Sequence, residues 1–267
     1  MSGILQQIVC QKRREVEAAK FKAPIRRISV LAAKAPEPRE FKHALDSEAV
    51  SLIAEVKRAS PSKPNLAPLL DVVAQATVYE RNGASCCSVL TDMHFDGTLD
   101  DLERVRAATT IPVLRKDFVF DEYQVYESRA RGADAVLLIA AITREPEELA
   151  RLVELCLHLG MLPLVEVHDA QEVSVALGAG AGLIGINNRD LRTFATDIKV
   201  TKKIRPLVPA HVPVVSESGI RNRLDVLEVA GYGVQAVLVG EVLVRAQDAA
   251  ALTRELVDAG KMARGDD

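Results

Sequence analysis

Several residue types are scarce in this sequence, and each shortage narrows the class of protein. The chain of 267 residues has no Trp, and aromatic residues make up only 4% of it. Its core must therefore be aliphatic, which suits packed parallel strands. Neither sign of charge is in clear excess, because the formal net charge is -3. A nucleic-acid-binding protein would normally show a basic excess, so we expect no nucleic-acid partner.

The chain also lacks the cysteine spacing of a metal site and any long apolar run. Its four cysteines, Cys10, Cys86, Cys87 and Cys156, show no CxxC spacing and no nearby pair of histidines, so the sequence does not support bound zinc. The first residues, MSGILQQIVCQKRRE, contain no apolar stretch long enough for a signal peptide, and no later run approaches a membrane span. We therefore expect a cytoplasmic protein with reduced cysteines and no membrane contact.

What the sequence does have is a regular alternation of short apolar runs with amphipathic segments, beginning at residue 51. The runs have the length of buried strands, and the intervening segments, such as DEYQVYESRARG and NRLDVLEVAG, have helical periodicity. Strands that alternate with helices imply right-handed crossovers and a parallel sheet. The eight predicted strands are 51–57, 86–92, 112–118, 135–141, 162–168, 183–190, 212–219 and 236–240.

Eight such units favour a single (β/α)8 TIM barrel, a fold of about 250 residues. An open dinucleotide-binding sheet is disfavoured, because no GxGxxG follows the first strand. Residues 1–50 fall outside the eight units, and they predict one helix, at about 4–20, followed by a proline-rich connection. We divide the chain into an N-terminal helical extension packed on the barrel (1–50) and a catalytic barrel domain (51–267). A flexible N-terminal tail is the alternative.

Polar residues occur at the ends of several predicted strands rather than in their middles. The stretch PVLRKDF, for example, begins as a buried strand and ends in charged residues. The carboxyl ends of the strands of a barrel meet at one face, where catalytic groups are found. Lys and Glu at this face must form ion pairs or take part in catalysis, because burying either charge alone is costly. The alternative is that they form salt bridges that line the barrel and have no catalytic role. The polar strand ends are Glu55 and Lys57, 115–117, Glu166, 187–190 and 216–218.

Two glycine-containing strand ends predict a phosphate site. SESGI puts Ser218 and Gly219 before a helix that begins near Arg221, and LVGE puts Gly240 and Glu241 before the final helical stretch. Glycine lets the backbone approach a ligand, and N–H groups at helix starts favour anions. The loops after the last two strands are also the usual phosphate site of this fold. The residues alone therefore predict a barrel enzyme that acts on a small phosphate ester by acid–base chemistry, with helix-packing glycines as the alternative.

These motifs closely resemble the indole-3-glycerol-phosphate synthase family of tryptophan biosynthesis. The matching segments are LIAEVKRASPSK, VLTD, PVLRKDF, ADAVLLIAA, LVEVHD, IGINNRDL, VSESGI and VLVGE, in order between residues 52 and 241. The resemblance implies a carboxy-lyase that closes the ring of 1-(2-carboxyphenylamino)-1-deoxyribulose 5-phosphate to give indole-3-glycerol phosphate, releasing carbon dioxide and water. It implies a small-molecule substrate, no cofactor and no metal. It also implies a monomer with at most a weak association with other enzymes of the pathway.

The resemblance assigns catalytic roles to individual side chains. Lys116 of the RKDF motif would be the general acid that protonates the ribulose carbonyl oxygen. Glu166 of LVEVHD would be the base that helps the later dehydration. Glu55 and Lys57 would support them, with Lys57 set to meet the substrate carboxylate or to relay a proton. The predicted catalytic set is Lys116, Glu166, Glu55, Lys57, Asn187 and Ser218.

By the same resemblance, a second group of residues would bind the substrate. Phe118, Leu137 and Leu191 would form an apolar bed for the aromatic ring, and Arg189 would contact an anion. Ser60 and the backbone of the two glycine-containing strand ends would hold the phosphate. The predicted binding set is Ser60, Phe118, Leu137, Arg189, Leu191, Glu217, Gly219, Gly240 and Glu241.

The sequence departs from the family pattern in two places. Pro64 stands where the family usually has glycine in SPSKG, and proline removes an N–H. Asp96 and Thr98 stand where the family more often has an aromatic residue or Gln, and Ser. Two other functions stay open at this point. One is a ribulose-phosphate isomerase barrel, which normally uses an Asp or Cys acid–base pair, and the other is a non-catalytic barrel that only binds a sugar phosphate.

Overall fold

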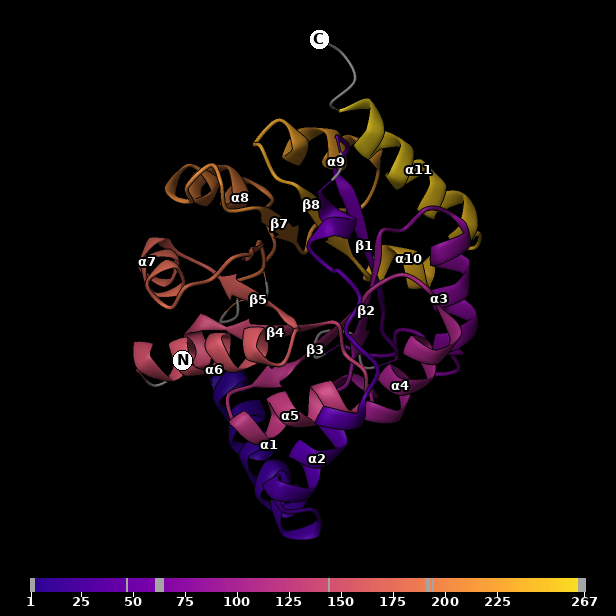
Figure 1. Cartoon of the computed structure of the whole chain (residues 1–267). Coiled ribbons are helices and arrows are strands. Elements are labelled where there is room, and N and C mark those ends of the chain that lie inside the picture. The colour runs from indigo at the N-terminus through magenta and orange to yellow at the C-terminus, as the bar shows by residue number, and fades with distance from the viewer. Residues whose placement is uncertain are drawn as a thin grey trace.

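Eight parallel strands close into a barrel at the centre of the molecule, and helices surround it (Figure 1). Strands pair in sequence order and the last pairs with the first, which confirms the predicted (β/α)8 barrel. The strands are β1 (Ser51–Val56), β2 (Cys86–Leu90), β3 (Val113–Val119), β4 (Ala135–Ile139), β5 (Leu162–Val167), β6 (Ile184–Asn187), β7 (Val214–Glu217) and β8 (Ala236–Val239). This computed structural model describes residues 3–46, 48–60, 65–143, 145–190, 193 and 195–263.

The helices that connect the strands begin at polar capping residues. Thr98 and Asp101 form a reciprocal capping box at the start of α4. The side chains of Asp71 and Asp169 cap α3 and α7 by accepting backbone N–H groups of the first turn. The α-helices are α3 (Val72–Arg81), α4 (Leu99–Ala108), α5 (Glu122–Ala130), α6 (Pro146–His158), α7 (Ala170–Gly178), α8 (Lys199–Ile204), α9 (Arg223–Ala230), α10 (Glu241–Arg245) and α11 (Ala249–Met262). Short 3-10 helices are η1 (His43–Leu45), η2 (Met93–Phe95), η3 (Ala140–Ile142) and η4 (Arg205–Leu207).

Two helices, not one, precede the barrel. They are α1 (Gly3–Lys22) and α2 (Ile25–Lys34), and the second corrects the prediction of a proline-rich connection there. Pro24 lies directly before α2, where the missing N–H of proline removes no helical hydrogen bond. The helix buries Ile28 and Ala32 and packs against α5, beside which it lies in Figure 1.

The interior of the barrel is mostly apolar below its open end. The interior is filled by aliphatic side chains from alternate positions of the strands, including Ile53, Leu114, Leu164 and Val215. A second apolar layer lies between the outer faces of the strands and the helices. Above the apolar filling of the interior, a cavity is lined by charged side chains that include Glu55, Lys116, Glu166 and Glu217.

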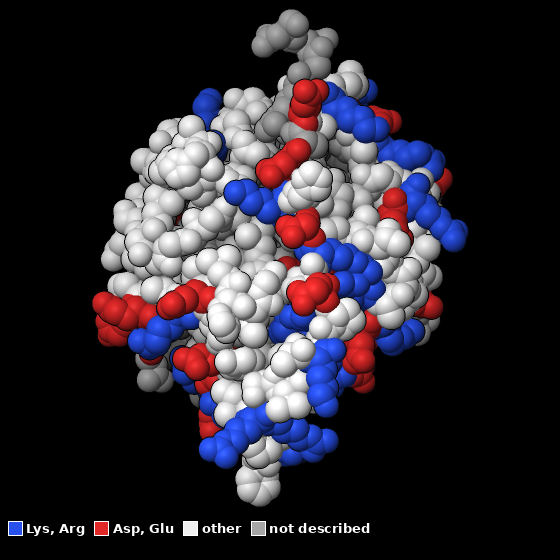
Figure 2. Space-filling model, in the orientation of Figure 1, with Lys and Arg blue, Asp and Glu red and all other residues white. Residues whose placement is uncertain are grey.

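The visible surface carries charges of both signs. Figure 2 shows Lys and Arg beside Asp and Glu over much of this face, as the small net charge predicts. Within the described part of the chain, no helix combines the length and apolar character required to cross a bilayer.

Candidate active site

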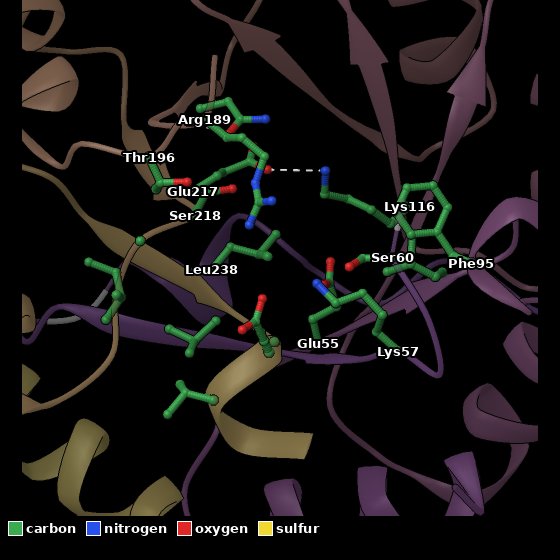
Figure 3. A pocket seen from close by; sticks show the side chains of 18 of the residues that line it. Glu55, Lys57, Ser60, Phe95, Lys116, Arg189, Thr196, Glu217, Ser218 and Leu238 are labelled. Atoms are coloured by element: carbon green, nitrogen blue, oxygen red, sulfur yellow. Dashed lines mark hydrogen bonds and ion pairs between the residues drawn. The ribbon is translucent and has the colours of Figure 1, made fainter. Parts of the chain in front are cut away.

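A cavity of about 790 Å³ opens at the carboxyl ends of the strands (Figure 3). This volume lies within the usual range for small-molecule sites. Every predicted site residue that the structure describes lines it, whereas Leu191 and Pro64 lie outside the described residues. The predicted residues around the cavity are Glu55, Lys57, Ser60, Lys116, Phe118, Leu137, Glu166, Asn187, Arg189, Glu217, Ser218, Gly219, Gly240 and Glu241.

Lys116 lies between two carboxylates. It stands in the middle of β3, which continues to Val119, so the prediction that this strand ends in its charged residues is wrong. Its Nζ is 3.1 Å from Glu166 Oε2 on β5 and 3.2 Å from Glu217 Oε2 on β7. Burial disfavours the charged ammonium, but the carboxylates of Glu217, Glu166 and Glu55 outweigh this penalty and raise the pKa of Lys116. Lys116 therefore holds a proton at neutral pH, at the edge of the cavity.

The two carboxylates around Lys116 differ in acidity. Burial raises the pKa of Glu166, but Lys116, His168 and Asn187 more than reverse this, and the net pKa is well below the usual range. Burial also raises the pKa of Glu217; Lys116 offsets this only partly and Glu166 adds to it, so the pKa is about 7. One carboxylate is thus ionised at neutral pH while the other exchanges a proton there. Two neighbouring carboxyl groups whose pKa values differ in this way are suited to acid–base catalysis.

Glu55 and Lys57 form a second ion pair at the end of β1. Lys57 Nζ lies 2.7 Å from Glu55 Oε1, and the two side chains point into the cavity from the same face of the strand. Gly240 lies against this pair, because a Cβ on that residue would overlap Glu55 Oε1. Glycine at 240 therefore makes room for Glu55, in addition to lining the cavity.

The loop after β7 has an unusual backbone. Ser218 and Gly219 both have left-handed φ values, 65° and 90°, and a non-glycine residue in that region is strained by roughly 1–3 kcal/mol. A Cβ on Gly219 would lie only 2.8 Å from Thr196 Cγ2. Strain of this kind persists where the surrounding structure enforces it, which is common at ligand sites.

The start of α9 differs from the prediction. The helix begins at Arg223 rather than near Arg221, and the side chain of Asn222 accepts the N–H groups of Leu224 and Asp225. The N-terminus of α9 is therefore already capped by a side chain of the protein. An anion at this loop would have to rely on the backbone at Ser218 and its neighbours.

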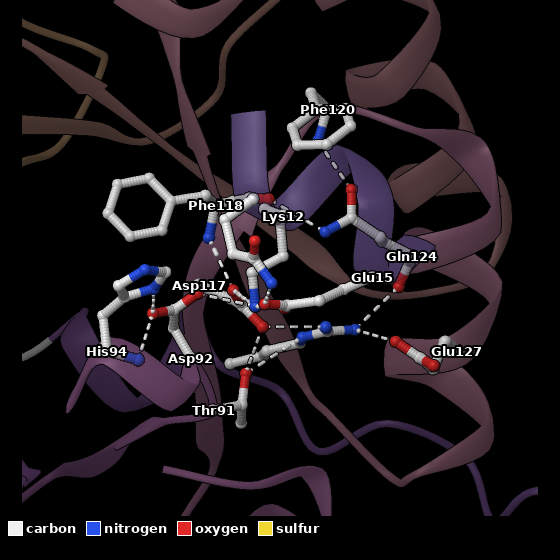
Figure 4. A network of polar contacts seen from close by, with 12 residues as sticks. Lys12, Glu15, Thr91, Asp92, His94, Asp117, Phe118, Phe120, Gln124 and Glu127 are labelled. Atoms are coloured by element: carbon white, nitrogen blue, oxygen red, sulfur yellow. Dashed lines mark hydrogen bonds and ion pairs between the residues drawn. The ribbon is translucent and has the colours of Figure 1, made fainter. Parts of the chain in front are cut away.

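Only one of the three charges in PVLRKDF points toward the catalytic groups. Arg115 and Asp117 alternate with Lys116 along β3, and Arg115 Nη2 donates to Asp117 Oδ2 at 2.9 Å. Lys12 of α1 completes this network, with its Nζ 3.1 Å from Asp117 Oδ1 and 2.6 Å from Asp92 Oδ2 (Figure 4). These buried ion pairs join α1 to the open end of the barrel. For Arg115 and Asp117, therefore, the alternative of salt bridges without a catalytic role holds.

Sequence reasoning missed part of the cavity wall. Leu5 and Ile8 of α1, Phe95 of η2 and Arg221 also line it. The sequence predicted a helix here that packs on the barrel, but nothing in it indicated which residues of the helix reach the cavity. Among the described residues, no three His, Cys, Asp or Glu side chains gather in a way that could hold a metal ion.

Fold and site together define a barrel enzyme with acid–base groups in a small-molecule cavity. The family is given by comparison with known proteins: the family model described as Indole-3-glycerol phosphate synthase matches residues 5–256. The chain belongs to the indole-3-glycerol phosphate synthase family.

Curated relatives carry the same name. A protein from Dehalococcoides mccartyi (strain ATCC BAA-2266 / KCTC 15142 / 195), named indole-3-glycerol phosphate synthase, is 48% identical over 259 residues, which cover 95% of this chain and 100% of the relative. One of the same name from Roseiflexus sp. (strain RS-1) is 47% identical, covering 96% of this chain and 98% of the relative.

Solved structures share the fold at low identity. Thiamine phosphate pyrophosphorylase from Pyrococcus furiosus matches with a TM-score of 0.63 and 19% identity, over 81% of this chain and 98% of the other. The 3-hexulose-6-phosphate synthase of Salmonella typhimurium matches with a TM-score of 0.62 and 15% identity, over 80% of this chain and 100% of the other. These matches support the barrel and nothing beyond it.

Proposed function

We propose that this protein is an indole-3-glycerol phosphate synthase of tryptophan biosynthesis. It converts 1-(2-carboxyphenylamino)-1-deoxyribulose 5-phosphate into indole-3-glycerol phosphate, carbon dioxide and water. The observation that carries the proposal is a protonated Lys116 held between Glu166 and Glu217 in a cavity that apolar side chains and the loop after β7 also line. The family membership of the chain supports the same reaction.

Ring closure is the first step. The aromatic carbon that bears the carboxylate attacks the ribulose carbonyl carbon, and the carbonyl oxygen becomes a hydroxyl by taking the proton of Lys116. An ammonium is suited to this step, because the developing alkoxide is more basic than a neutral amine. Loss of carbon dioxide then returns its bonding electrons to the ring. A positioned general acid contributes about 10²–10⁴-fold to such a rate.

Dehydration completes the indole. The hydroxyl needs one further proton to leave as water, and Lys57, 2.7 Å from Glu55, relays it. Glu166 takes the proton that the ring must lose for the double bond to form. Asn187 Nδ2 donates to Glu166 Oε1 at 3.0 Å and fixes the orientation of this base. Two protons are donated and one is taken up, so the carboxylate substrate and one proton from solvent give one indole product, one carbon dioxide and one water, and the proton from solvent restores the ammonium of Lys116.

Substrate binding divides the cavity into two ends. Phe118 and Leu137 contact the aromatic ring, while Ser60 and the backbone of Gly219, Gly240 and Glu241 hold the phosphate. Ser218 and Glu217 lie between the two ends, and Arg189 contacts an anionic group. A role for Leu191 in the apolar bed stays a prediction from the resemblance. All the described members of this set line one cavity, which supports the division.

The N-terminal segment belongs to the same proposal. Residues 1–50 act as a helical extension on a barrel domain of residues 51–267, and Leu5 and Ile8 give it part of the cavity wall. We further propose a cytoplasmic monomer that needs no cofactor and associates at most weakly with other enzymes of the pathway. Size-exclusion chromatography with light scattering checks the oligomeric state.

One assay tests the proposed function against its alternatives. Purified protein is mixed with 1-(2-carboxyphenylamino)-1-deoxyribulose 5-phosphate, and indole absorbance and released carbon dioxide are followed together. We expect both to appear in equal amounts. A ribulose-phosphate isomerase would give neither, and would act on an aminoaldose phosphate instead. A non-catalytic barrel would bind the substrate and leave it unchanged.

A further inference from the structure

The base Glu166 has a second cationic neighbour besides Lys116. It is His168, which lies directly after the end of β5 at Val167. Its Nε2 lies 3.3 Å from Glu166 Oε1, which is ion-pair distance. The side chain of His168 does not line the cavity, whereas Glu166 does. His168 therefore acts on the base from behind and does not touch substrate.

The imidazole of His168 is held in place from α7. Its Nδ1 lies 3.0 Å from Glu172 Oε2, and the backbone N–H of His168 donates to the same oxygen at 2.8 Å. Glu172 is fixed in turn, because its own N–H donates to Asp169, the residue that caps α7. The ring thus has Nδ1 hydrogen-bonded to Glu172 and Nε2 facing Glu166 at ion-pair distance, where Nε2 makes no hydrogen bond with any described residue.

Charge agrees with this geometry. Burial disfavours the protonated ring, but Glu166 and Glu172 outweigh the penalty and raise the pKa of His168 to about 10. At neutral pH the side chain is a cation. It is also only 16% exposed, so little water screens it from Glu166.

The charges around Glu166 change during the reaction. Lys116 faces it from β3, Glu217 lies on the other side of Lys116 from β7, and Asn187 donates to it from β6. When Lys116 gives its proton to the carbonyl oxygen, two buried carboxylates are left around a neutral amine. Their repulsion would draw a proton onto one of the two carboxylates, and a proton on Glu166 would disable it as a base. His168 still faces Glu166 with a positive charge at that moment.

We propose that His168 is a positioning residue, which keeps Glu166 ionised and aligned for dehydration after Lys116 has been discharged. The inference rests on the proposed function, since it gives Glu166 the role of base. Its consequence is specific. Without His168, turnover should fall mainly at acidic pH, where Glu166 takes up a proton, and substrate affinity should change little.

The test is the pH profile of kcat in His168→Gln. An opposite charge within about 4–6 Å lowers a carboxyl pKa by about 1–3 units, so its loss should move the acid limb up by at least one unit. We expect the acid limb of His168→Gln, followed from pH 8 down to the lowest pH at which both proteins stay folded, to lie at least one unit above that of wild type, with KM within about twofold. His158→Gln, an exposed histidine at the end of α6, is the matched control and should leave the profile unchanged.

A second variant covers the case in which His168→Gln folds poorly. Glu172→Gln keeps the ring in place but removes one of the two carboxylates that keep it charged, so the acid limb should move in the same direction by less. The same fractional loss of kcat at every pH in both variants, or no shift at all, would overturn the inference. Wild type is run alongside. If wild type forms no indole product, the proposed function fails, and if wild type is active with unshifted variants, only the role of His168 fails.

Discussion

Replacing Lys116 with Met removes the ammonium between Glu166 and Glu217 and keeps a side chain of similar length. The two Nζ distances are 3.1 and 3.2 Å, both carboxylates are buried, and the Lys116 side chain is only 14% exposed. Removing one partner of a buried ion pair costs about 3–5 kcal/mol, because an uncompensated charge is left behind. For chains of 150–250 residues each kcal/mol lowers Tm by about 2–4 °C. At pH 8 we therefore expect Lys116→Met to melt at least about 6 °C below wild type, and to lose about 10²–10⁴-fold in kcat.

The destabilisation of Lys116→Met should depend on pH in a defined direction. Without the ammonium, burial and mutual repulsion raise the pKa of both carboxyls in the folded state above their unfolded values. A carboxyl with a raised folded pKa costs no stability below its unfolded pKa of about 4.5, and costs more as pH rises toward the folded value. The Tm deficit should thus be small at pH 5 and large at pH 8. Adding Glu217→Gln removes one of the two unpaired buried carboxylates, so the double variant should recover part of the lost Tm at pH 8.

Thermal unfolding followed by circular dichroism at pH 5, 6.5 and 8 measures this deficit. Lys20→Met is the matched control, because Lys20 pairs with Asp121 at 2.7 Å but is 33% exposed. Exposed pairs contribute about 1 kcal/mol or less, so this variant should stay near wild type at every pH. A deficit for Lys116→Met that does not change with pH would refute the buried-triad interpretation. A fall in kcat of less than tenfold would remove Lys116 as the general acid.

Four further variants test the site. Glu166→Gln keeps the acceptor oxygen, so kcat should fall at least about 100-fold with KM nearly unchanged; a raised KM at constant kcat would show a binding role. Glu217→Gln should gain Tm relative to wild type as pH rises from about 5 to 7.5, because the raised pKa of about 7 costs wild type stability over that range; a constant difference would contradict this. Gly219→Ala, with φ of 90° and a close Thr196, should weaken inhibition by inorganic phosphate at least about tenfold, whereas Gly240→Ala should lower kcat through Glu55. Unchanged phosphate inhibition in a folded Gly219→Ala protein would show that the phosphate binds elsewhere.

Most of the strands could be predicted from the sequence because they are largely apolar runs. Parallel strands buried on both faces need such runs, and each of the eight predicted runs contains its strand or ends one residue short of it. The strand β3 is the exception in composition, because it continues through three charged residues, 115–117, to Val119. The helix α2 was missed because Pro24 was interpreted as part of a connection, although proline also stands directly before helices.

The contacts between distant segments were not predictable. Lys12 lies 105 positions from Asp117, and nothing local to either residue indicates that they pair. Strand alternation does separate the charges of PVLRKDF into an inward Lys116 and an outward Arg115, but it does not say what the outward face meets. The role of Gly240 beside Glu55 depends on a packing distance between β1 and the end of β8, which a linear pattern does not contain.

A structure of the wild-type protein with a substrate analogue tests the central claim most directly. The analogue is the substrate with its ribulose carbonyl reduced to an alcohol, which can bind but cannot be attacked. We expect the alcohol oxygen within hydrogen-bond distance of Lys116 Nζ, the aromatic ring against Phe118 and Leu137, and the phosphate at the backbone of Gly219 and Gly240. An analogue bound with its alcohol oxygen away from Lys116, or with its phosphate at the opposite end of the cavity, would contradict the assignment of this site.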